Sequence, residues 1–341
     1  MINRYKVITF FLLCAISTQT LFSNFFSKSK KPEEIIHKKL PIKKNGTLLI
    51  ENIHGNIDIK TEWSQNYIIL NATKQISKKE NQEDIEIKLN NNAPKNEIII
   101  KTELKNDKMK SSIDYELIIP GNININLKTD TGSITVNKCT GEIIASTNKG
   151  YITIEEITGQ ISLETNQGNI SVTQAHGKVT SKTTSGDINL EGISGSIDAQ
   201  TKKGSIYVAQ AQGNIKAETQ KGNITLENSN KNIDAKTQSG TIKVACKEIP
   251  STSCIKLATI SGNIHLDIPK NTNADIQART EKGSLLSDHF ITLKPQTVRL
   301  NKDAWKRFKR EVDGTIGSGE ALIKLSANSG NIKISNTSVE S

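Results

Sequence analysis

Apolar and polar residues alternate in short runs along most of the chain, and these runs recur at a fixed interval. A typical run reads Gly168-Asn169-Ile170-Ser171-Val172, and similar Gly-x-Ile-x-Val runs return about every nine residues. Strict alternation is typical of a β-strand with one buried face, and β-branched side chains fit such a pleated surface. Glycine and small polar residues between the runs supply turns. The pattern therefore predicts units of strand, turn, strand and turn.

Two series of glycines give the period of these units. Within each series the glycines lie 18 residues apart, and the second series falls midway between members of the first. A short fixed period means that each unit buries its apolar side only by stacking on its neighbours. We therefore predict an all-β fold, a single-stranded β-solenoid with 18-residue coils, right-handed because parallel connections prefer that hand. The series are Gly132, Gly150, Gly168, Gly186, Gly204, Gly222 and Gly240, and then Gly141, Gly159, Gly177, Gly195 and Gly213.

Residues 18 positions apart should stack in columns of shared character. Inward columns carry Ile, Val, Leu or Ala, and outward columns are polar. In some outward columns the charge alternates, so Glu164 should lie beside Lys182, and Glu218 beside Lys236. A further column consists of threonines, which we expect to hydrogen-bond along the column while their methyl groups pack. Its members are Thr129, Thr147, Thr165, Thr183, Thr201, Thr219 and Thr237.

The start of the chain has the pattern of a secretory signal peptide. Met1–Lys6 is short and basic, Val7–Ile16 is apolar, and Ala15 and Ser17 are small residues at plausible cleavage positions. An uncleaved N-terminal anchor is the alternative, because apolar residues resume at Leu21. Both interpretations predict an exported protein, in the periplasm, at the cell surface or secreted.

The rest of the chain reads as one continuous domain. Hydrophobic residues make up 35% of the sequence and aromatic residues 4%, which is lean for a globular core but sufficient for the thin aliphatic core of a solenoid. Irregular glycine spacing towards both ends indicates coils that cap the stack. The expected organisation is a signal peptide or anchor at 1–23, a basic linker at 24–40 and the solenoid at 41–338, divided into N-terminal capping coils at 41–128, regular repeats at 129–245 and irregular C-terminal coils with an insertion at 246–338.

Three cysteines lie beyond the signal segment. Cys246 and Cys254 flank an irregular loop that contains Pro250, and an oxidising compartment would permit them to form a disulfide. Two unpaired thiols are the alternative. Cys139 falls in an inward column and should behave as a small buried hydrophobe. The Cys and His spacings do not resemble a metal site, and no cofactor is predicted.

The formal net charge of +10 is concentrated near the ends. Trp305 and Phe308 recur near helical spacing within a basic cluster, which predicts a short amphipathic helix over 303–312. This helix would either pack over the end of the solenoid or contact an anionic surface, such as lipid head groups or acidic glycans, at the membrane periphery. Nucleic acid is not an expected partner, because few aromatic residues are present to stack on bases. The cluster consists of Lys302, Lys306, Arg307, Lys309 and Arg310.

Candidate catalytic groups are dispersed. Glycoside-cleaving enzymes need paired carboxylates, but Glu164, Asp198 and Glu218 are interleaved with lysines along the repeat. His176 is expected at a turn, and its spacing from Ser and Asp residues does not indicate a Ser-His-Asp triad. We therefore predict that the protein is not an enzyme.

Two outward tyrosines are candidates for stacking on glycans. We expect Tyr151 and Tyr207 to lie in one column, three coils or about 14 Å apart. Scattered surface aromatics without a binding role are the alternative. The expected contact surface is a flat polar face that bears these tyrosines with Asn169, Asp187 and Asn223.

Three stretches resemble a known bacterial family. They are Ile113–Pro120 continued by Leu127–Ile134, the long Gly-x-Ile-x-Val series, and Asp313–Glu320 followed by Ser329–Ile332. Together they are similar to the putative-adhesin family of domain of unknown function DUF4097, also called toastrack, over roughly residues 40–338. The resemblance implies a single-stranded β-helix without known catalytic residues, often tied to the cell envelope. In some relatives it implies a part in envelope-stress sensing.

The sequence thus favours an exported, non-enzymatic β-solenoid that serves as an adhesin-like or envelope-associated interaction scaffold. Candidate partners are a surface glycan, an envelope component or another protein. The alternative is a cell-envelope stress sensor that binds lipid or a cationic peptide. A polysaccharide-active β-helix enzyme is the third hypothesis.

Overall fold

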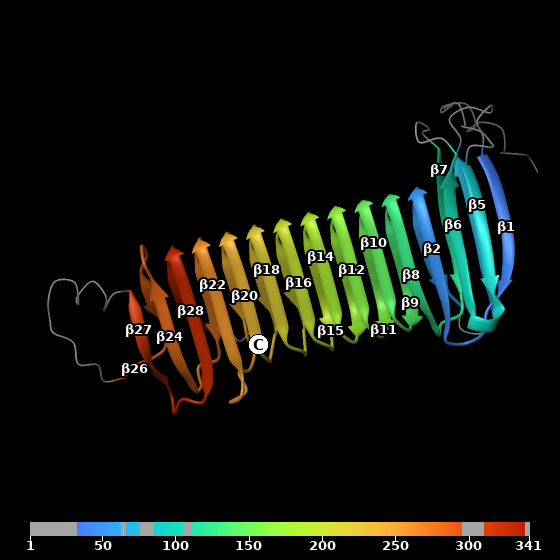
Figure 1. Ribbon diagram of the computed structural model, residues 1–341. Helices are drawn as coiled ribbons and strands as arrows, with labels where there is room; N and C mark the ends of the chain where they lie inside the picture. Colours follow the sequence, from blue (N-terminus) through green and yellow to red (C-terminus); the bar gives the residue numbers. More distant parts are fainter. Residues whose placement is uncertain (1–32, 63–65, 76–84, 106–110, 295–309, 338–341) are drawn as a thin grey trace, which may run out of the picture.

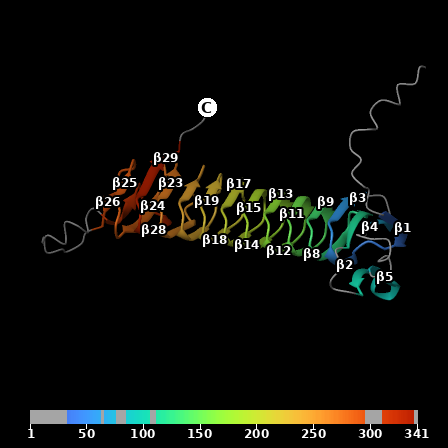
Figure 2. The ribbon, with the colours of Figure 1, turned by 90° about the horizontal axis from the view of Figure 1, so that it is seen from above.

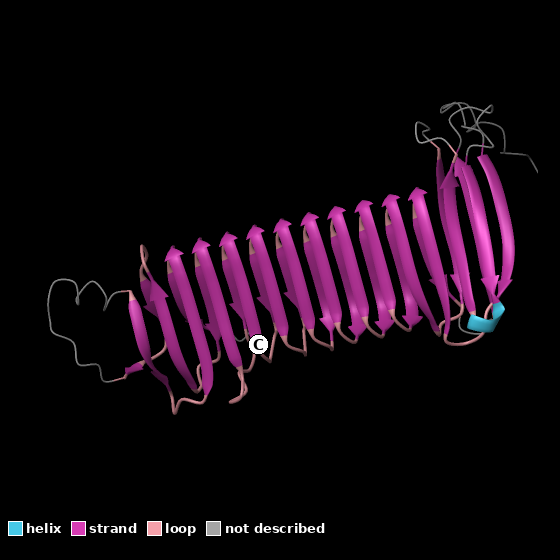
Figure 3. Cartoon of the chain, viewed as in Figure 1, coloured by secondary structure: helices cyan, strands magenta, loops and turns pink. Residues whose placement is uncertain are grey.

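The molecule is a rod of β-strands stacked side by side (Figure 1). Two long sheets, named sheet A and sheet B, form its two faces and enclose a thin core between them (Figure 2). Helical structure in the described part is limited to one 3-10 turn, η2 (Ala93–Lys95), next to the N-terminal strands (Figure 3). The protein is therefore all-β with a toastrack-like repeat. The structure, a computed structural model, describes residues 33–62, 66–75, 85–105, 111–294 and 310–337.

Sheet A has 14 strands among the described residues. Its strands are parallel along the repeat and antiparallel at the N-terminal end, where β1 pairs with β4 and β4 with β7. The spatial order is β1 (Glu33–Pro41), β4 (Tyr67–Gln75), β7 (Ser112–Ile119), β3 (Ile57–Thr61), β9 (Ile134–Thr140), β11 (Ile152–Thr158), β13 (Ile170–His176), β15 (Ile188–Ile193), β17 (Ile206–Ala209), β19 (Ile224–Glu227), β21 (Ile242–Ala245), β23 (Ile264–Ile268), β29 (Ile332–Asn336) and β25 (Leu285–Ser287).

Sheet B has 15 strands in the same described part. It too is mixed, because β27 is antiparallel to β24 and β26, and β5 is antiparallel to β6. The spatial order is β26 (Thr292–Leu293), β27 (Glu311–Ile316), β24 (Ala274–Thr280), β28 (Ala321–Ser329), β22 (Cys254–Ser261), β20 (Ile233–Ser239), β18 (Ile215–Lys221), β16 (Ile197–Lys203), β14 (Val179–Ser185), β12 (Ile161–Gln167), β10 (Ile143–Lys149), β8 (Ile123–Thr131), β2 (Gly46–His54), β6 (Glu97–Leu104) and β5 (Ile85–Asn92).

Inward columns set the register of the parallel strands. In sheet B, Ile143 pairs with Ile161, and Ile161 pairs with Val179; in sheet A, Ile152 pairs with Ile170. All of these side chains are buried. Because a slip of one residue would turn a whole strand's apolar side chains to solvent, the buried columns hold the register firmly.

At both ends of the rod the spatial order of coils departs from the order along the chain. The coil of β2 and β3 lies between the coil of β8 and β9 and the coil of β6 and β7. Likewise the last coil, β28 and β29, lies between β22–β23 and β24–β25. Each end is therefore closed by contacts between segments that are distant in sequence.

The N-terminal edge of sheet A is formed by β1, which covers a segment assigned to the basic linker at 24–40 by the sequence analysis. From residue 33 onwards this segment is a strand, antiparallel to β4 along its whole length. The alternating pattern there is weak, because β1 carries only a few apolar residues among charged ones. Charged edge strands of this kind discourage pairing with further chains.

The threonine column is buried, but the expected bonding along the column is wrong. From Thr147 to Thr237 each hydroxyl donates instead to a glycine carbonyl 15 residues earlier in the chain, as from Thr147 to Gly132 at 3.0 Å and from Thr201 to Gly186 at 3.0 Å. Thr129 donates to the carbonyl oxygen of Gly55 at 3.2 Å. The acceptor carbonyl belongs to the turn of the preceding coil. The bonds therefore tie each sheet B strand to a neighbouring turn and satisfy hydroxyls that would otherwise be costly to bury. The other pairs in the regular repeat are Thr165–Gly150, Thr183–Gly168, Thr219–Gly204 and Thr237–Gly222.

A buried polar cluster near the N-terminal end has no counterpart in the regular coils. The Thr102 hydroxyl donates to Asn52 Oδ1 at 2.9 Å and lies 2.6 Å from the Tyr115 hydroxyl. Asn52 Nδ2 donates to the carbonyl oxygen of Ile113 at 2.8 Å. Burial raises the pKa of Tyr115 to about 12. These bonds link β2, β6 and β7, and so fix the odd coil order at this end.

Candidate interaction surface

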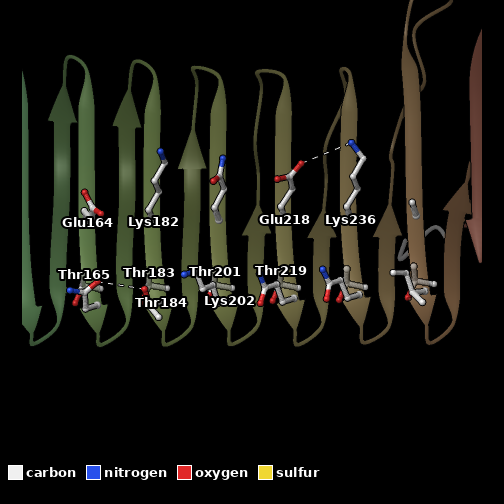
Figure 4. A pocket seen from close by; sticks show the side chains of 18 of the residues that line it. Glu164, Thr165, Lys182, Thr183, Thr184, Thr201, Lys202, Glu218, Thr219 and Lys236 are labelled. Carbon is white, nitrogen blue, oxygen red and sulfur yellow. Dashed lines mark hydrogen bonds and ion pairs between the residues drawn. The ribbon is translucent and has the colours of Figure 1, made fainter.

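A shallow trough of about 830 Å³ runs along the outer face of sheet B (Figure 4). It crosses the strands from β12 to β28, parallel to the long axis of the rod. Its walls are two rows of side chains, which are named the charged ridge and the polar ridge. The charged ridge consists of Glu164, Lys182, Gln200, Glu218 and Lys236, and the polar ridge of Asn166, Thr184, Lys202, Gln220 and Gln238.

The alternation of the strands creates the trough. Successive side chains of a strand point to opposite faces, so Glu164 and Asn166 point outward while Thr165 between them is buried. The same arrangement recurs on each coil. On each strand the buried threonine leaves a gap between the two outward side chains that flank it. The gaps of successive strands lie in line and form a hollow that follows the rod for several coils.

Opposite charges meet on the charged ridge, as the sequence predicts for Glu218 and Lys236. Their side chains lie 4.0 Å apart, and Glu218 also lies 3.6 Å from Lys216. Lys236 is 3.1 Å from Asp234 on its own strand. Glu164 and Lys182 are neighbours in register. Because these groups are well exposed, each pair contributes less than about 1 kcal/mol to stability.

The polar ridge begins with a run of side-chain hydrogen bonds. Asn148 Nδ2 donates to Asp130 Oδ1 at 3.4 Å, Asn166 Nδ2 donates to Asn148 Oδ1 at 2.7 Å, and the Thr184 hydroxyl lies 3.5 Å from Asn166 Oδ1. Further along, Gln220 and Gln238 are exposed. The trough thus presents amides, hydroxyls and ammonium groups to solvent.

The outer face of sheet A carries a different polar column, which holds the coils together. On several coils the side chain that follows the turn glycine accepts a hydrogen bond from a backbone N–H of the next coil. Asn169 Oδ1 accepts from Asp187 N at 2.9 Å, and Asp187 Oδ1 accepts from Ser205 N at 2.7 Å. Asn223 Oδ1 continues the series with Thr241 N at 2.9 Å. Three residues of the expected contact face are thus engaged inside the stack.

The expected pairing of the two tyrosines in one column is wrong. The column of Tyr151 continues through Asn169 and Asp187 to Ser205, as the side-chain ladder shows. Tyr207 instead pairs in register with Asn189, two positions further along its strand than the ladder residue Ser205. The sequence already separates the two positions, because Tyr151 follows its turn glycine by one residue and Tyr207 follows Gly204 by three.

The two tyrosines also differ in their surroundings. The Tyr207 hydroxyl donates to Glu227 Oε2 at 2.9 Å, and this bond is the main reason why its pKa is raised. Tyr151 is 59% exposed. The structure therefore does not bring them together as one aromatic platform.

The family model for the toastrack domain DUF4097 matches residues 38–246 and 216–335. These matches span most of the chain. The chain belongs to the DUF4097 toastrack family. A comparison with curated proteins found no match.

Several solved structures are similar to this toastrack chain at low identity. A "putative cell adhesion protein" from Clostridium sporogenes is 11% identical, with a TM-score of 0.23, over 90% of this chain and 100% of that chain. A "putative adhesin" from Bacteroides fragilis is 13% identical, with a TM-score of 0.39, over 89% and 97%. One from Parabacteroides distasonis is 13% identical, with a TM-score of 0.37, over 67% and 95%. The family assignment rests on the family match alone.

Among the described residues Cys139, Cys246 and Cys254 are free thiols, which agrees with the alternative of two unpaired thiols at Cys246 and Cys254 rather than with a disulfide. Cys246 follows β21 on sheet A and is buried, whereas Cys254 begins β22 on sheet B. The loop between them is closed by a backbone hydrogen bond from Ser253 N to the Pro250 carbonyl oxygen at 2.9 Å. Burial raises the pKa of Cys246 to about 12 and that of Cys139 to about 11. Neither buried thiol is therefore reactive at neutral pH.

The basic cluster falls largely outside the described residues, where Lys302, Lys306, Arg307 and Lys309 all lie. Arg310 is described, and its guanidinium donates to the Glu281 carbonyl oxygen at 2.7 Å. The last part of the helix expected over 303–312 is wrong, because β27 begins at residue 311 and pairs antiparallel with β24.

Within the described ranges, no three His, Cys, Asp or Glu side chains come together to hold a metal ion. His176 Nδ1 instead lies 3.1 Å from the Ser194 hydroxyl. No helix of the described part is long and apolar enough to span a bilayer.

Proposed function

We propose that this toastrack protein is an exported, non-enzymatic interaction scaffold of the adhesin type, and that its contact surface is the trough on sheet B. The observation that carries the proposal is the contrast between the two faces. On sheet A the polar ladder side chains are used to hold coils together. On sheet B the polar side chains line an open hollow that follows the rod.

The shape of the trough suits an extended polymer. Like positions on successive coils are about 4.8 Å apart, so a chain lying along the rod meets the same kinds of group at each step. An elongated contact of this kind can add many weak contacts into useful avidity. The acidic groups on the charged ridge, Glu164 and Glu218, are separated by Lys182 and Gln200, which supports binding rather than paired-carboxylate catalysis.

Export and coil handedness are further parts of the proposal. Export is supported by the basic and apolar segments at the start of the sequence, which lie outside the described residues. A right-handed coil is supported by the general preference of parallel strand connections. The stress-sensor alternative relies on the basic cluster, and no contact of the described residues favours it.

Binding of the purified, labelled chain to fixed epithelial cells and to whole bacterial cells tests the proposed surface. Thr184→Tyr places a bulky neutral side chain in the trough and should weaken binding at least tenfold, because it fills the hollow. Thr153→Tyr is the matched control, since Thr153 is an exposed strand residue on the outer face of sheet A. Binding should be measured by flow cytometry over a range of concentrations.

Two results would contradict the proposal. Loss of binding in Thr153→Tyr with retention in Thr184→Tyr would move the contact surface to sheet A, and absence of binding to either cell type would remove the adhesin role. New reducing ends released from a panel of polysaccharides would instead show an enzyme.

A further inference from the structure

We propose that the C-terminal end of the rod docks on an anionic lipid bilayer through Leu286, Phe290 and Leu293, which are named the apolar tip. This surface is separate from the trough, which crosses sheet B from β12 to β28. The apolar tip lies on the stretch of chain that passes from β25 on sheet A to β26 on sheet B. Both strands lie at the same end of the rod (Figure 2).

Large apolar side chains of the apolar tip are open to solvent. Phe290 is 99% exposed, the highest value for a large apolar side chain among the described residues, and Leu286 and Leu293 are 59% and 48% exposed. Single exposed apolar side chains are ordinary on a protein surface. Three of them within residues 286–293 form a group of the kind that marks an interaction site.

The chain around Phe290 is fixed rather than loose. The Ser287 hydroxyl accepts a hydrogen bond from His289 N at 3.1 Å and donates to the His289 carbonyl oxygen at 3.1 Å. Ile291, the next residue after Phe290, packs against the core. The loop therefore buries Ile291 and presents Phe290 to solvent.

The arrangement of the three side chains suits a fluid surface. Leu286 belongs to the edge strand of sheet A, Leu293 to the edge strand of sheet B, and Phe290 to the loop between them. They surround the end of the rod and do not form one flat face. A bilayer adapts its shape to such an end, and apolar side chains can enter the boundary between head groups and acyl chains.

The described charges at this end of the rod nearly balance. Lys294 Nζ lies 3.3 Å from Asp275 Oδ1 and 3.8 Å from Asp313 Oδ1. Arg279 pairs in register with Glu311. These groups alone would therefore give little preference between an anionic and a neutral surface.

The sequence that follows the apolar tip makes the end of the rod basic. The described chain stops at Lys294 and resumes at Arg310, whose guanidinium donates to the Glu281 carbonyl oxygen at 2.7 Å. Between these two residues the sequence carries five Lys or Arg residues and one acidic residue, Asp303. Basic residues beside an anionic leaflet strengthen binding, and an apolar group becomes a stable anchor when a polybasic patch accompanies it. Charge complementarity therefore favours an anionic bilayer.

Sedimentation of the full chain with lipid vesicles tests the inference. Binding should be tighter to vesicles of equal parts phosphatidylglycerol and phosphatidylcholine than to phosphatidylcholine alone, and added salt should weaken it. Phe290→Ser should weaken binding about tenfold or more, because it removes a large apolar side chain from the contact. Lys306→Gln should weaken it about fivefold. Ile35→Ser is the matched control, because Ile35 is 68% exposed at the opposite end of the rod, and it should bind like the parent chain.

Hydrogen exchange locates the contact within the chain. With vesicles present, the backbone amides of residues 285–293 should exchange more slowly, and those of β1 should not change. Phe290→Ser should keep the free energy of unfolding of the parent chain, because the side chain that it replaces is almost fully exposed.

Four results would overturn docking by the apolar tip. They are equal binding of Phe290→Ser and the parent chain, loss of binding in Ile35→Ser alone, equal binding to neutral and anionic vesicles, and a lower free energy of unfolding in Phe290→Ser. The last result would show that Phe290 packs against its own chain. Thr184→Tyr should bind vesicles like the parent chain while losing cells, so failure of this inference is distinguishable from failure of the trough.

Discussion

Gly186 and Gly192 both adopt positive φ, at 152° and 68°, but their neighbours differ. A Cβ on Gly186 would overlap the carbonyl oxygen of Gly168 on the preceding coil. A Cβ on Gly192 would meet nothing closer than the backbone of Gln174 at 3.6 Å, an ordinary contact. Gln174 and Gln210, which flank Gly192 in its column, themselves adopt positive φ. Gly192 therefore lies in a left-handed region that non-glycine residues of its own column also adopt, whereas Gly186 combines a backbone region that L side chains rarely adopt with the close approach of the stacked turns.

Alanine at these two positions should accordingly have unequal effects. Gly192→Ala should lower the free energy of unfolding by about 1–2 kcal/mol, the cost of the left-handed conformation. Gly186→Ala should lower it by about 3 kcal/mol or more, because overpacking against a fixed backbone adds about 1–3 kcal/mol. Urea unfolding followed by circular dichroism measures both. Equal losses would show that stacking distance is not what selects glycine.

At the scale of the strand and its turn, the side-chain ladder on sheet A acts as a second set of bonds between coils. Asn56 Oδ1 accepts from Ser133 N at 2.9 Å, and Asn263 Oδ1 accepts from Asn331 N at 2.8 Å, so the ladder reaches both ends of the rod. Tyr151 interrupts it, because its acceptor oxygen stands at the far end of the ring rather than close to the backbone, as in Asn, Asp or Ser. At this position the residue present does not supply the hydrogen bond that the other coils make.

Substitutions in the ladder should change stability in opposite directions. Asn223→Ala removes the acceptor for Thr241 N and should lower the free energy of unfolding by about 0.5–1.5 kcal/mol. Tyr151→Asn supplies the missing acceptor to Asn169 N and should raise it by a similar amount. Thermal unfolding of the two variants and the parent chain measures this. A fall in Tyr151→Asn would mean that the tyrosine packs against its neighbours more than the ladder requires.

At the scale of the whole molecule, sequence predicts what repeats and misses what does not. The inward columns can be predicted from spacing alone, because every coil has an apolar residue, such as Ile170, at the same position of the 18-residue repeat. The bond from Thr147 to Gly132 repeats every coil as well, and a search for polar partners 15 residues apart would have found it. The insertion of β28 and β29 between earlier coils has no local signal, since only long-range pairing decides it. The trough could not be predicted from single positions either, because two outward rows of side chains on several coils form it together.

The coils inserted out of chain order close both ends of the rod. A simple solenoid would expose its first and last strands to fraying and to pairing with other chains. Here β24 pairs in parallel with β28, and antiparallel β27 covers the other edge of β24. Loss of the last coil would therefore release more of the C-terminal end than its own residues.

Buried thiols and a buried phenol spread along the rod make its stability dependent on alkaline pH. Burial raises the pKa of Cys139 from 9.0 to about 11, of Cys246 from 9.0 to about 12, and of Tyr115 from 10.0 to about 12. The fold therefore favours the neutral form of each group. Their contributions are complete below the unfolded pKa values and are lost as pH rises from there towards the folded values.

The chain should thus lose stability from about pH 9 upwards, by about 1.4 kcal/mol per ionising group and pH unit. Urea unfolding under reducing conditions between pH 7.5 and about pH 10.5 measures the loss. A Cys139→Ala/Cys246→Ala variant should move its onset to about pH 10, where Tyr115 begins to ionise in the unfolded chain. Cys254→Ala is the control, because Cys254 is only half-buried, and it should retain the parent profile. An unchanged onset in the double variant would assign the alkaline loss to exposed lysines instead, whose ion pairs, such as Lys101 with Glu51, also disappear as the ammonium groups deprotonate.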